Sequence, residues 1–188
     1  MFGGTFDPVH VAHLAAASEV RHRLSLDRVL VVVAPDPWQK RGRVVAGAED
    51  RYAMVEAALD GVPGLEASRV ELDRAGPTYT VDTLRMLVAP SRALFLIVGS
   101  DVASRLGTWE RVDDIRSLVT LVVVDRDGVA EAPVDSWDSG GWRVERVPIP
   151  RLDISSSELR RRVALGAPID FLVPPGAVRV LRERRLYT

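Results

Sequence analysis

The sequence contains no cysteine, and this absence excludes disulfide bonds, thiol catalysis and metal sites built from thiolates. Long apolar runs are also missing, since a stretch such as Val29–Pro35 is far too short to cross a membrane. No basic segment followed by an apolar one precedes the first motif, so nothing indicates secretion. We therefore expect a cytoplasmic protein without a membrane partner.

An excess of charge of one sign is lacking as well, because the formal net charge is −1. A protein that binds nucleic acid usually carries a broad basic field, and none is expected here. Any anionic ligand must therefore be bound by a local group of residues.

The 188 residues are 47% apolar and 27% charged, which is typical of a globular protein. This length suffices for one domain with a substantial core, and we predict a single domain over residues 1–188.

Apolar, β-branched runs alternate with helical patterns along the chain. The strands are expected at Arg28–Ala34, Leu65–Leu72, Ala93–Val98, Leu118–Val124 and Trp142–Val147. The helices are expected at Ala12–Leu24, Glu49–Leu59, Val81–Val88, Ser156–Leu165 and Pro175–Arg184, and a surface loop at Gly128–Gly141. This alternation predicts an α/β fold with a doubly wound parallel sheet, whose ligands bind beyond the carboxyl ends of the strands.

The first strand of this sheet looks short. Only Met1 and Phe2 precede Gly3, whereas a strand usually has about five residues. We expect that the natural start lies upstream or that the sequence has been trimmed.

The most informative motif is Gly3-Gly4-Thr5, followed by His10 and His13. Glycines let the backbone approach an anion closely, and the helix that follows offers free N–H groups. Histidines three residues apart share one face of a helix. A Gly-Gly turn or a lone histidine is more often structural, but together they indicate a phosphate-binding catalytic site. Asp7 has no obvious role toward an anion and is expected to brace the turn.

A second motif begins at Ile154, continues through Ser155, Ser156 and Ser157, and ends with Arg160. Hydroxyls, a helix N-terminus and a guanidinium together suit a phosphate chain. The alternative is an ordinary serine-rich helix start, in which Ser155 or Ser156 is the N-cap.

These two motifs resemble the signatures of the nucleotidyltransferases that carry the HxGH motif, with Ala12 where that family usually has glycine. The resemblance implies a Rossmann-like fold, catalytic roles for His10 and His13, and Mg²⁺ that enters with ATP. It implies an ATP site formed by Gly3, Gly4, Thr5, His10, His13, Gly99, Asp101, Ile154, Ser155, Ser156, Ser157 and Arg160. No cluster of His and Asp has the spacing of metal ligands, so we expect no metal site built by the protein alone.

Three further segments resemble the nicotinate mononucleotide adenylyltransferases: Pro37–Lys40, Gly76–Leu84, and Gly99–Asp101 with Thr108-Trp109. The resemblance implies that Lys40 pairs with a phosphate, that Thr78 and Tyr79 meet the pyridine carboxylate, and that Trp109 stacks on the ring. A solvated lysine, a helix start at Thr80 or Asp82 and a packing tryptophan are the structural alternatives. Arg126 matches an arginine near the nucleotide, although Asp127 stands where the family often has proline.

The implied activity is transfer of AMP from ATP to nicotinate mononucleotide, which gives deamido-NAD and pyrophosphate in NAD biosynthesis. Phosphopantetheine adenylyltransferase, a cytidylyltransferase and a non-catalytic nucleotide-binding regulator are the alternatives. The expected partners are these small molecules, and assembly into a homo-oligomer stays open.

Overall fold

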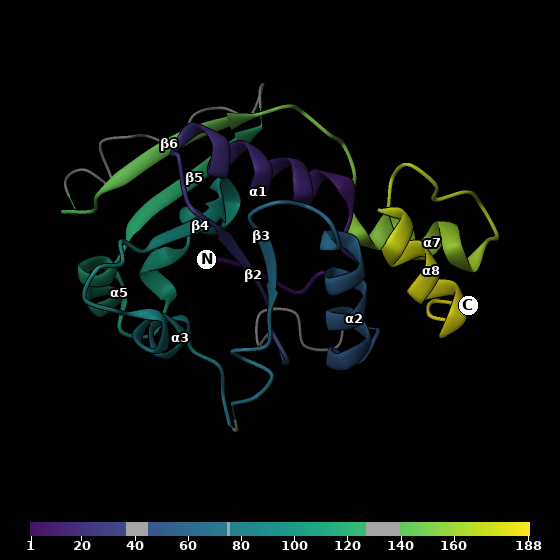
Figure 1. Cartoon of the computed structure of the whole chain (residues 1–188), viewed down its shortest axis with the longest axis horizontal. Helices are drawn as coiled ribbons and strands as arrows, with labels where there is room; N and C mark the ends of the chain where they lie inside the picture. Colours follow the sequence, from purple (N-terminus) through teal and green to yellow (C-terminus); the bar gives the residue numbers. More distant parts are fainter. Residues whose placement is uncertain (37–44, 75, 127–139) are drawn as a thin grey trace.

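The structure, a computed structural model, describes residues 1–36, 45–74, 76–126 and 140–188 (Figure 1). The strands are β1 (Phe2–Gly4), β2 (Val29–Val33), β3 (Leu65–Ser68), β4 (Phe95–Gly99), β5 (Thr120–Arg126) and β6 (Val144–Ile149). The helices are α1 (Val11–Arg23), α2 (Ala48–Leu59), α3 (Thr80–Leu87), α4 (Ser100–Ala103), η2 (Leu106–Thr108), α5 (Val112–Leu118), α7 (Ser156–Ala164) and α8 (Pro175–Glu183).

The six strands form one sheet in the order β3-β2-β1-β4-β5-β6, and every neighbouring pair is parallel. The chain builds outward from β1 to β3, then returns to the other side of β1 and continues from β4 to β6. The order therefore reverses between β1 and β4, which is the point where ligands bind in such sheets. The predicted doubly wound parallel sheet is confirmed.

Both faces of the sheet are buried, which explains why its strands are almost continuously apolar. In β4, Ile97 faces the core formed with α1, α2 and α8, whereas Leu96 and Val98 face the core formed with α3 and α5. The alternation follows from the two-residue period of a strand. Figure 1 shows α7 and α8 together at the C-terminal end, beside α2.

The prediction for β3 was wrong at its carboxyl end, because the strand ends at Ser68 and not at Leu72. The next residues turn, since the Asp73 amide donates to the Arg69 carbonyl. The Arg69 guanidinium also donates to the Asp73 carboxylate at 3.1 Å and to Glu49 on α2 at 2.9 Å. These polar contacts end the strand and direct the chain toward α3.

The chain between β4 and β5 was not predicted to be helical, yet it forms α4, η2 and α5. As a consequence Leu118 belongs to α5, and β5 begins at Thr120, two residues later than expected. The strand β1 is short, as expected, and it pairs with β2 and β4. The single domain and the upstream start both stay predictions. No helix in the described part of the chain is long and apolar enough to span a membrane.

Candidate active site

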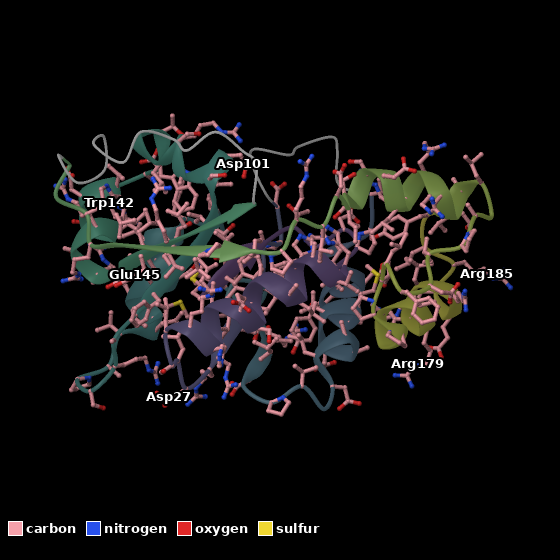
Figure 2. All side chains as sticks on the ribbon, turned by 90° about the horizontal axis from the view of Figure 1, so that it is seen from above. Asp27, Asp101, Trp142, Glu145, Arg179 and Arg185 are labelled. Carbon is pink, nitrogen blue, oxygen red and sulfur yellow. The ribbon has the colours of Figure 1, made fainter. Side chains whose placement is uncertain are left out.

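The candidate site lies where the order of the strands reverses, at the carboxyl ends of β1 and β4. Two adjoining cavities open there, one of about 860 Å³ and one of about 340 Å³, and both are lined by Phe2 and Gly99. The larger cavity is bordered by the β1 turn and by the segment that leads into α3, and the smaller one by the start of α1. Figure 2 shows Asp101, which follows β4, and Asp27, which precedes β2, at opposite edges of the molecule.

The smaller cavity brings together His10, His13, Gly99 and Asp101, four of the residues expected at the ATP site. Gly99 lies beside the exposed side chain of Asp101, since a Cβ on Gly99 would lie 2.7 Å from a carboxylate oxygen of that residue. Ala12 also lines this cavity. Since Ala12 is helical, alanine fits its backbone conformation without strain.

The two histidines stack on one another. Their ring centroids are 3.6 Å apart, and His10, at the N-cap of α1, is only 3% exposed. The backbone N–H of His10 donates to Nδ1 of His13 at 3.2 Å. A neutral His13 therefore carries its proton on Nε2, which makes that atom the hydrogen-bond donor.

Packing explains why glycine occupies position 4 of this turn. A Cβ on Gly4 would lie 2.7 Å from the ring of Phe6. The backbone of Phe6 has a positive φ of 50°. The Phe6 ring also meets His13 edge to face, with centroids 5.0 Å apart. The turn and His13 are thus packed through one aromatic ring, and Gly3, Gly4 and Thr5 line the larger cavity.

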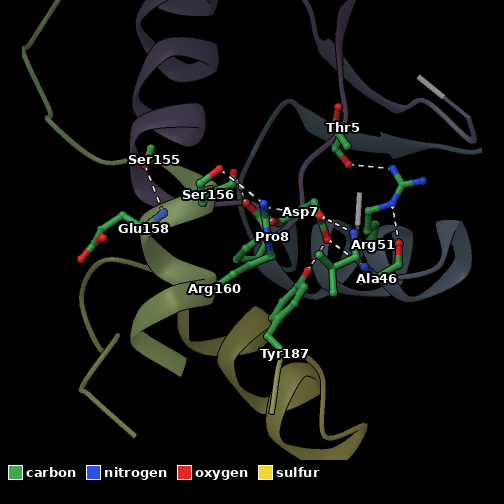
Figure 3. A network of polar contacts seen from close by, with 12 residues as sticks. Thr5, Asp7, Pro8, Ala46, Arg51, Ser155, Ser156, Glu158, Arg160 and Tyr187 are labelled. Carbon is green, nitrogen blue, oxygen red and sulfur yellow. Dashed lines mark hydrogen bonds and ion pairs between the residues drawn. The ribbon is translucent and has the colours of Figure 1, made fainter. Parts of the chain in front are cut away.

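Asp7 braces the turn, as the sequence predicts, and it is 3% exposed (Figure 3). Its carboxylate accepts hydrogen bonds from the amides of Val45 and Ala46 at 2.9 and 3.1 Å. It also accepts the hydroxyl of Tyr187 at 2.7 Å, and burial beside this carboxylate raises the pKa of Tyr187. The C-terminus is thereby held against the first motif.

Arg160 lies against the same turn. Its guanidinium donates to the Asp7 carbonyl at 2.7 Å and lies 3.5 Å from the Asp7 carboxylate. Ser156 donates to the Pro8 carbonyl at 3.0 Å, while Ser155 caps α7 by accepting the Glu158 amide at 3.2 Å. The second motif therefore packs on the first, and Ser155 is confirmed as the N-cap. Of the remaining residues of this motif, Ile154 packs against the apolar core and Ser157 accepts a hydrogen bond from Arg160.

The larger cavity brings together Thr78, Tyr79 and Trp109, the residues expected to meet the acceptor. Glu71 also lines this cavity and is 6% exposed. It accepts a hydrogen bond from Thr83 on α3 at 2.8 Å, and burial raises the pKa of the Glu71 carboxyl. Glu71 was not among the site residues predicted from the sequence.

Five residues expected at the ATP site line neither of the two cavities: Ile154, Ser155, Ser156, Ser157 and Arg160. The side chains of two other expected residues are not described. Lys40 lies outside the described residues, as does nearly all of the loop expected at Gly128–Gly141. Arg126 ends β5, and its side chain is likewise outside the described part. Among the described residues, no group of three or more His, Cys, Asp or Glu could hold a metal ion.

Arg51 lines neither cavity but holds the backbone beside the larger one, and this role was not predicted from the sequence. It is 1% exposed on α2, and its guanidinium donates to the carbonyls of Thr5, Ala34, Pro35 and Ala46. One signal was present: Arg51 lies three and four residues before Met54 and Val55, on the apolar face of the helix. An arginine in that position is buried and must find acceptors.

Comparison with known proteins identifies the family of the chain. Residues 1–162 match the model of the cytidylyltransferase-like family. A protein of Streptomyces coelicolor named "Probable nicotinate-nucleotide adenylyltransferase" is 46% identical over 98% of this chain and 98% of its own length. One of Corynebacterium kroppenstedtii with the same name is 44% identical over 100% of this chain and 89% of its own length.

Among solved structures, the nicotinic acid mononucleotide adenylyltransferase of Plasmodium falciparum, in complex with NaAD, superposes with a TM-score of 0.81. It is 19% identical, and the match covers 99% of this chain and 95% of that one. This likeness confirms the fold. The matches to the family model and to the relatives show that the chain belongs to the cytidylyltransferase-like family and, within it, to the nicotinate-nucleotide adenylyltransferases.

Proposed function

We infer that the protein transfers the adenylyl group of ATP to nicotinate mononucleotide, giving deamido-NAD and pyrophosphate in NAD biosynthesis. The observation that carries this inference is the pair of cavities that share Phe2 and Gly99. One contains the two histidines, and the other contains the residues expected to bind a pyridine. Two substrates held in adjoining cavities can react directly, without a covalent intermediate on the enzyme.

In the proposed reaction a phosphate oxygen of the acceptor attacks the α-phosphorus of ATP. The bond from that phosphorus to the oxygen bridging to the β-phosphate breaks, and pyrophosphate leaves. Both substrates are anionic, so catalysis consists mainly of positioning and of stabilising charge. The N–H at Nε2 of His13 suits the stabilisation of charge, because Nδ1 of the same ring already accepts a hydrogen bond from the backbone N–H of His10.

The acceptor site is proposed in the larger cavity. The indole of Trp109 would stack on the flat pyridine ring. The backbone of Thr78 and Tyr79, at the N-terminus of α3, would meet the pyridine carboxylate. The names of the relatives at 44% and 46% identity support nicotinate mononucleotide over phosphopantetheine.

Mg²⁺ is proposed to enter as a complex with ATP. It typically keeps several waters and binds phosphate oxygens with few protein ligands, which suits a site whose described residues form no carboxylate cage. The homo-oligomer and the cytoplasmic location stay predictions of the sequence.

The test is a comparison of His10→Ala and His13→Ala with His22→Ala, an exposed position at the end of the same helix. We expect pyrophosphate release to fall about a hundredfold to a thousandfold in the first two variants, as when an oxyanion donor is removed. ATP binding, measured by calorimetry, should persist in both, and His22→Ala should match the wild type.

A wild-type protein that binds ATP but never releases pyrophosphate would support the non-catalytic regulator. Full activity in the His10 and His13 variants would also contradict the proposed roles. Thermal unfolding of each variant separates a lost function from a lost fold.

A further inference from the structure

The carboxylate of Asp82 lies between two arginines from different parts of the chain. Asp82 is in the first turn of α3, and its Oδ1 accepts a hydrogen bond from the guanidinium of Arg111, immediately before α5. Its Oδ2 lies 3.8 Å from the guanidinium of Arg74, in the turn that follows β3. One negative charge thus joins three segments.

Those three segments contribute part of the wall of the larger cavity. Arg74 lines the cavity itself and also donates to the Pro77 carbonyl at 3.2 Å, just before Thr78. Arg111 follows Trp109 by two residues. Asp82 therefore connects the wall that carries Thr78 to the wall that carries Trp109, while lying behind the cavity surface.

The backbone of Arg111 has an unfavourable conformation. Arg111 has a positive φ of 52°, which a residue with a Cβ adopts at an energetic cost. Its carbonyl accepts the amides of Asp114 and Ile115, so it also begins α5. The contact with Asp82 holds the side chain of this residue, and with it the end of the Trp109 segment.

We infer that Asp82 is a positioning residue for the acceptor, fixing the distance between the two walls of the larger cavity. This inference rests on the proposed function. Exposed ion pairs add little to stability, so the contribution is to geometry and not to folding. Without the carboxylate, two guanidinium groups would face one another and repel, and the walls would move apart. A misplacement of about 1 Å can reduce catalysis about a hundredfold.

The experiment compares Asp82→Asn with a matched control, Asp114→Asn. Asp114 occupies the same position in the first turn of α5 and pairs with Arg85 of α3 at 2.9 Å, so it joins the same two helices. Neither Asp114 nor Arg85 lines the cavity. Helix-start and surface-charge effects are therefore shared by the two variants.

In Asp82→Asn we expect the KM for nicotinate mononucleotide to rise about tenfold, within the range for a misplaced substrate, with an unchanged KM for ATP. In Asp114→Asn both constants should equal those of the wild type. Asp82→Glu, which restores the carboxylate, should recover most of the acceptor affinity. This split between the two substrates is a readout that a purely structural role would not produce.

Equal KM values for the acceptor in Asp82→Asn and Asp114→Asn would overturn the inference, as would an equal rise in the KM for both substrates. A wild-type protein that does not use nicotinate mononucleotide at all would overturn the proposed function and this inference together. The two failures are distinguishable, because a failure of the proposed function is already seen in the wild-type protein, without any variant.

Discussion

Replacing Arg51 with methionine should destabilise the protein far more than the loss of an exposed ion pair. The Arg51 guanidinium reaches three separate parts of the site, at the end of β1, the end of β2 and the start of α2. It donates to the carbonyls of Thr5 at 2.7 Å, Ala34 at 2.8 Å, Pro35 at 2.8 Å and Ala46 at 3.1 Å. Methionine keeps the apolar stem and loses all four bonds.

The size of the effect follows from two opposing contributions. A hydrogen bond from a charged donor contributes about 1.5–3 kcal/mol, so four of them contribute about 6–12 kcal/mol. Burying the cation costs several kcal/mol, and the same desolvation lowers the pKa of Arg51 despite the nearby carboxylate of Asp7. We expect a net loss of about 3–5 kcal/mol, a large part of the 5–15 kcal/mol that is usual for a domain.

The assay is urea unfolding of the wild type, Arg51→Met and Arg51→Lys. Lysine keeps the charge but cannot reach four carbonyls at once, so it should fall between the other two. Arg179→Met is the control, because Arg179 is exposed and points outward from α8 (Figure 2). A loss of less than about 1 kcal/mol in Arg51→Met would refute this reasoning, since a typical single hydrogen bond already contributes that much.

Three further predictions concern other parts of the fold. Tyr187→Phe should lower the free energy of unfolding by about 1.5–3 kcal/mol, since it removes a hydroxyl from the buried carboxylate of Asp7, and unchanged urea unfolding would contradict this. Gly176→Ala should cost about 1–3 kcal/mol, because its Cβ would lie 2.0 Å from the Ala57 carbonyl oxygen where α8 crosses α2; a more stable variant would show that helix propensity prevails. Burial raises the pKa of Glu71 above its ordinary 4.5, so the native state binds that proton more tightly and loses stability as the pH rises through this range. Glu71→Gln should therefore gain in melting temperature relative to the wild type as the pH is raised above 4.5, whereas a constant difference would contradict the assignment.

The strands of the sheet could be predicted because burial on both faces leaves a continuous apolar run, as in β2, β4 and β5. The end of β3 could not, since it depends on contacts of Arg69 with Asp73 and with a helix elsewhere in the chain. The helices between β4 and β5 were missed for a local reason. They are short, and the N-cap of α5, Arg111, has a left-handed conformation that no pattern of apolar residues predicts.

The site, too, could be predicted only in part. The carboxyl ends of parallel strands lie at one edge of the sheet, so the joint placement of Gly4 and Gly99 around the larger cavity could be predicted from the order of the elements. The contact between Asp7 and Tyr187 joins residues 180 positions apart, and no local pattern selects such a pair. Short-range spacing thus finds most of the residues that line the two cavities, whereas the groups that hold them in place come from the packing of distant segments.

The proposed activity is tested most directly by the choice of acceptor. Pyrophosphate release from Mg²⁺-ATP would be measured in parallel with nicotinate mononucleotide, nicotinamide mononucleotide, phosphopantetheine and no acceptor. We predict turnover chiefly with nicotinate mononucleotide. Turnover with phosphopantetheine in its place, or none with any acceptor by a folded protein, would contradict the proposed activity.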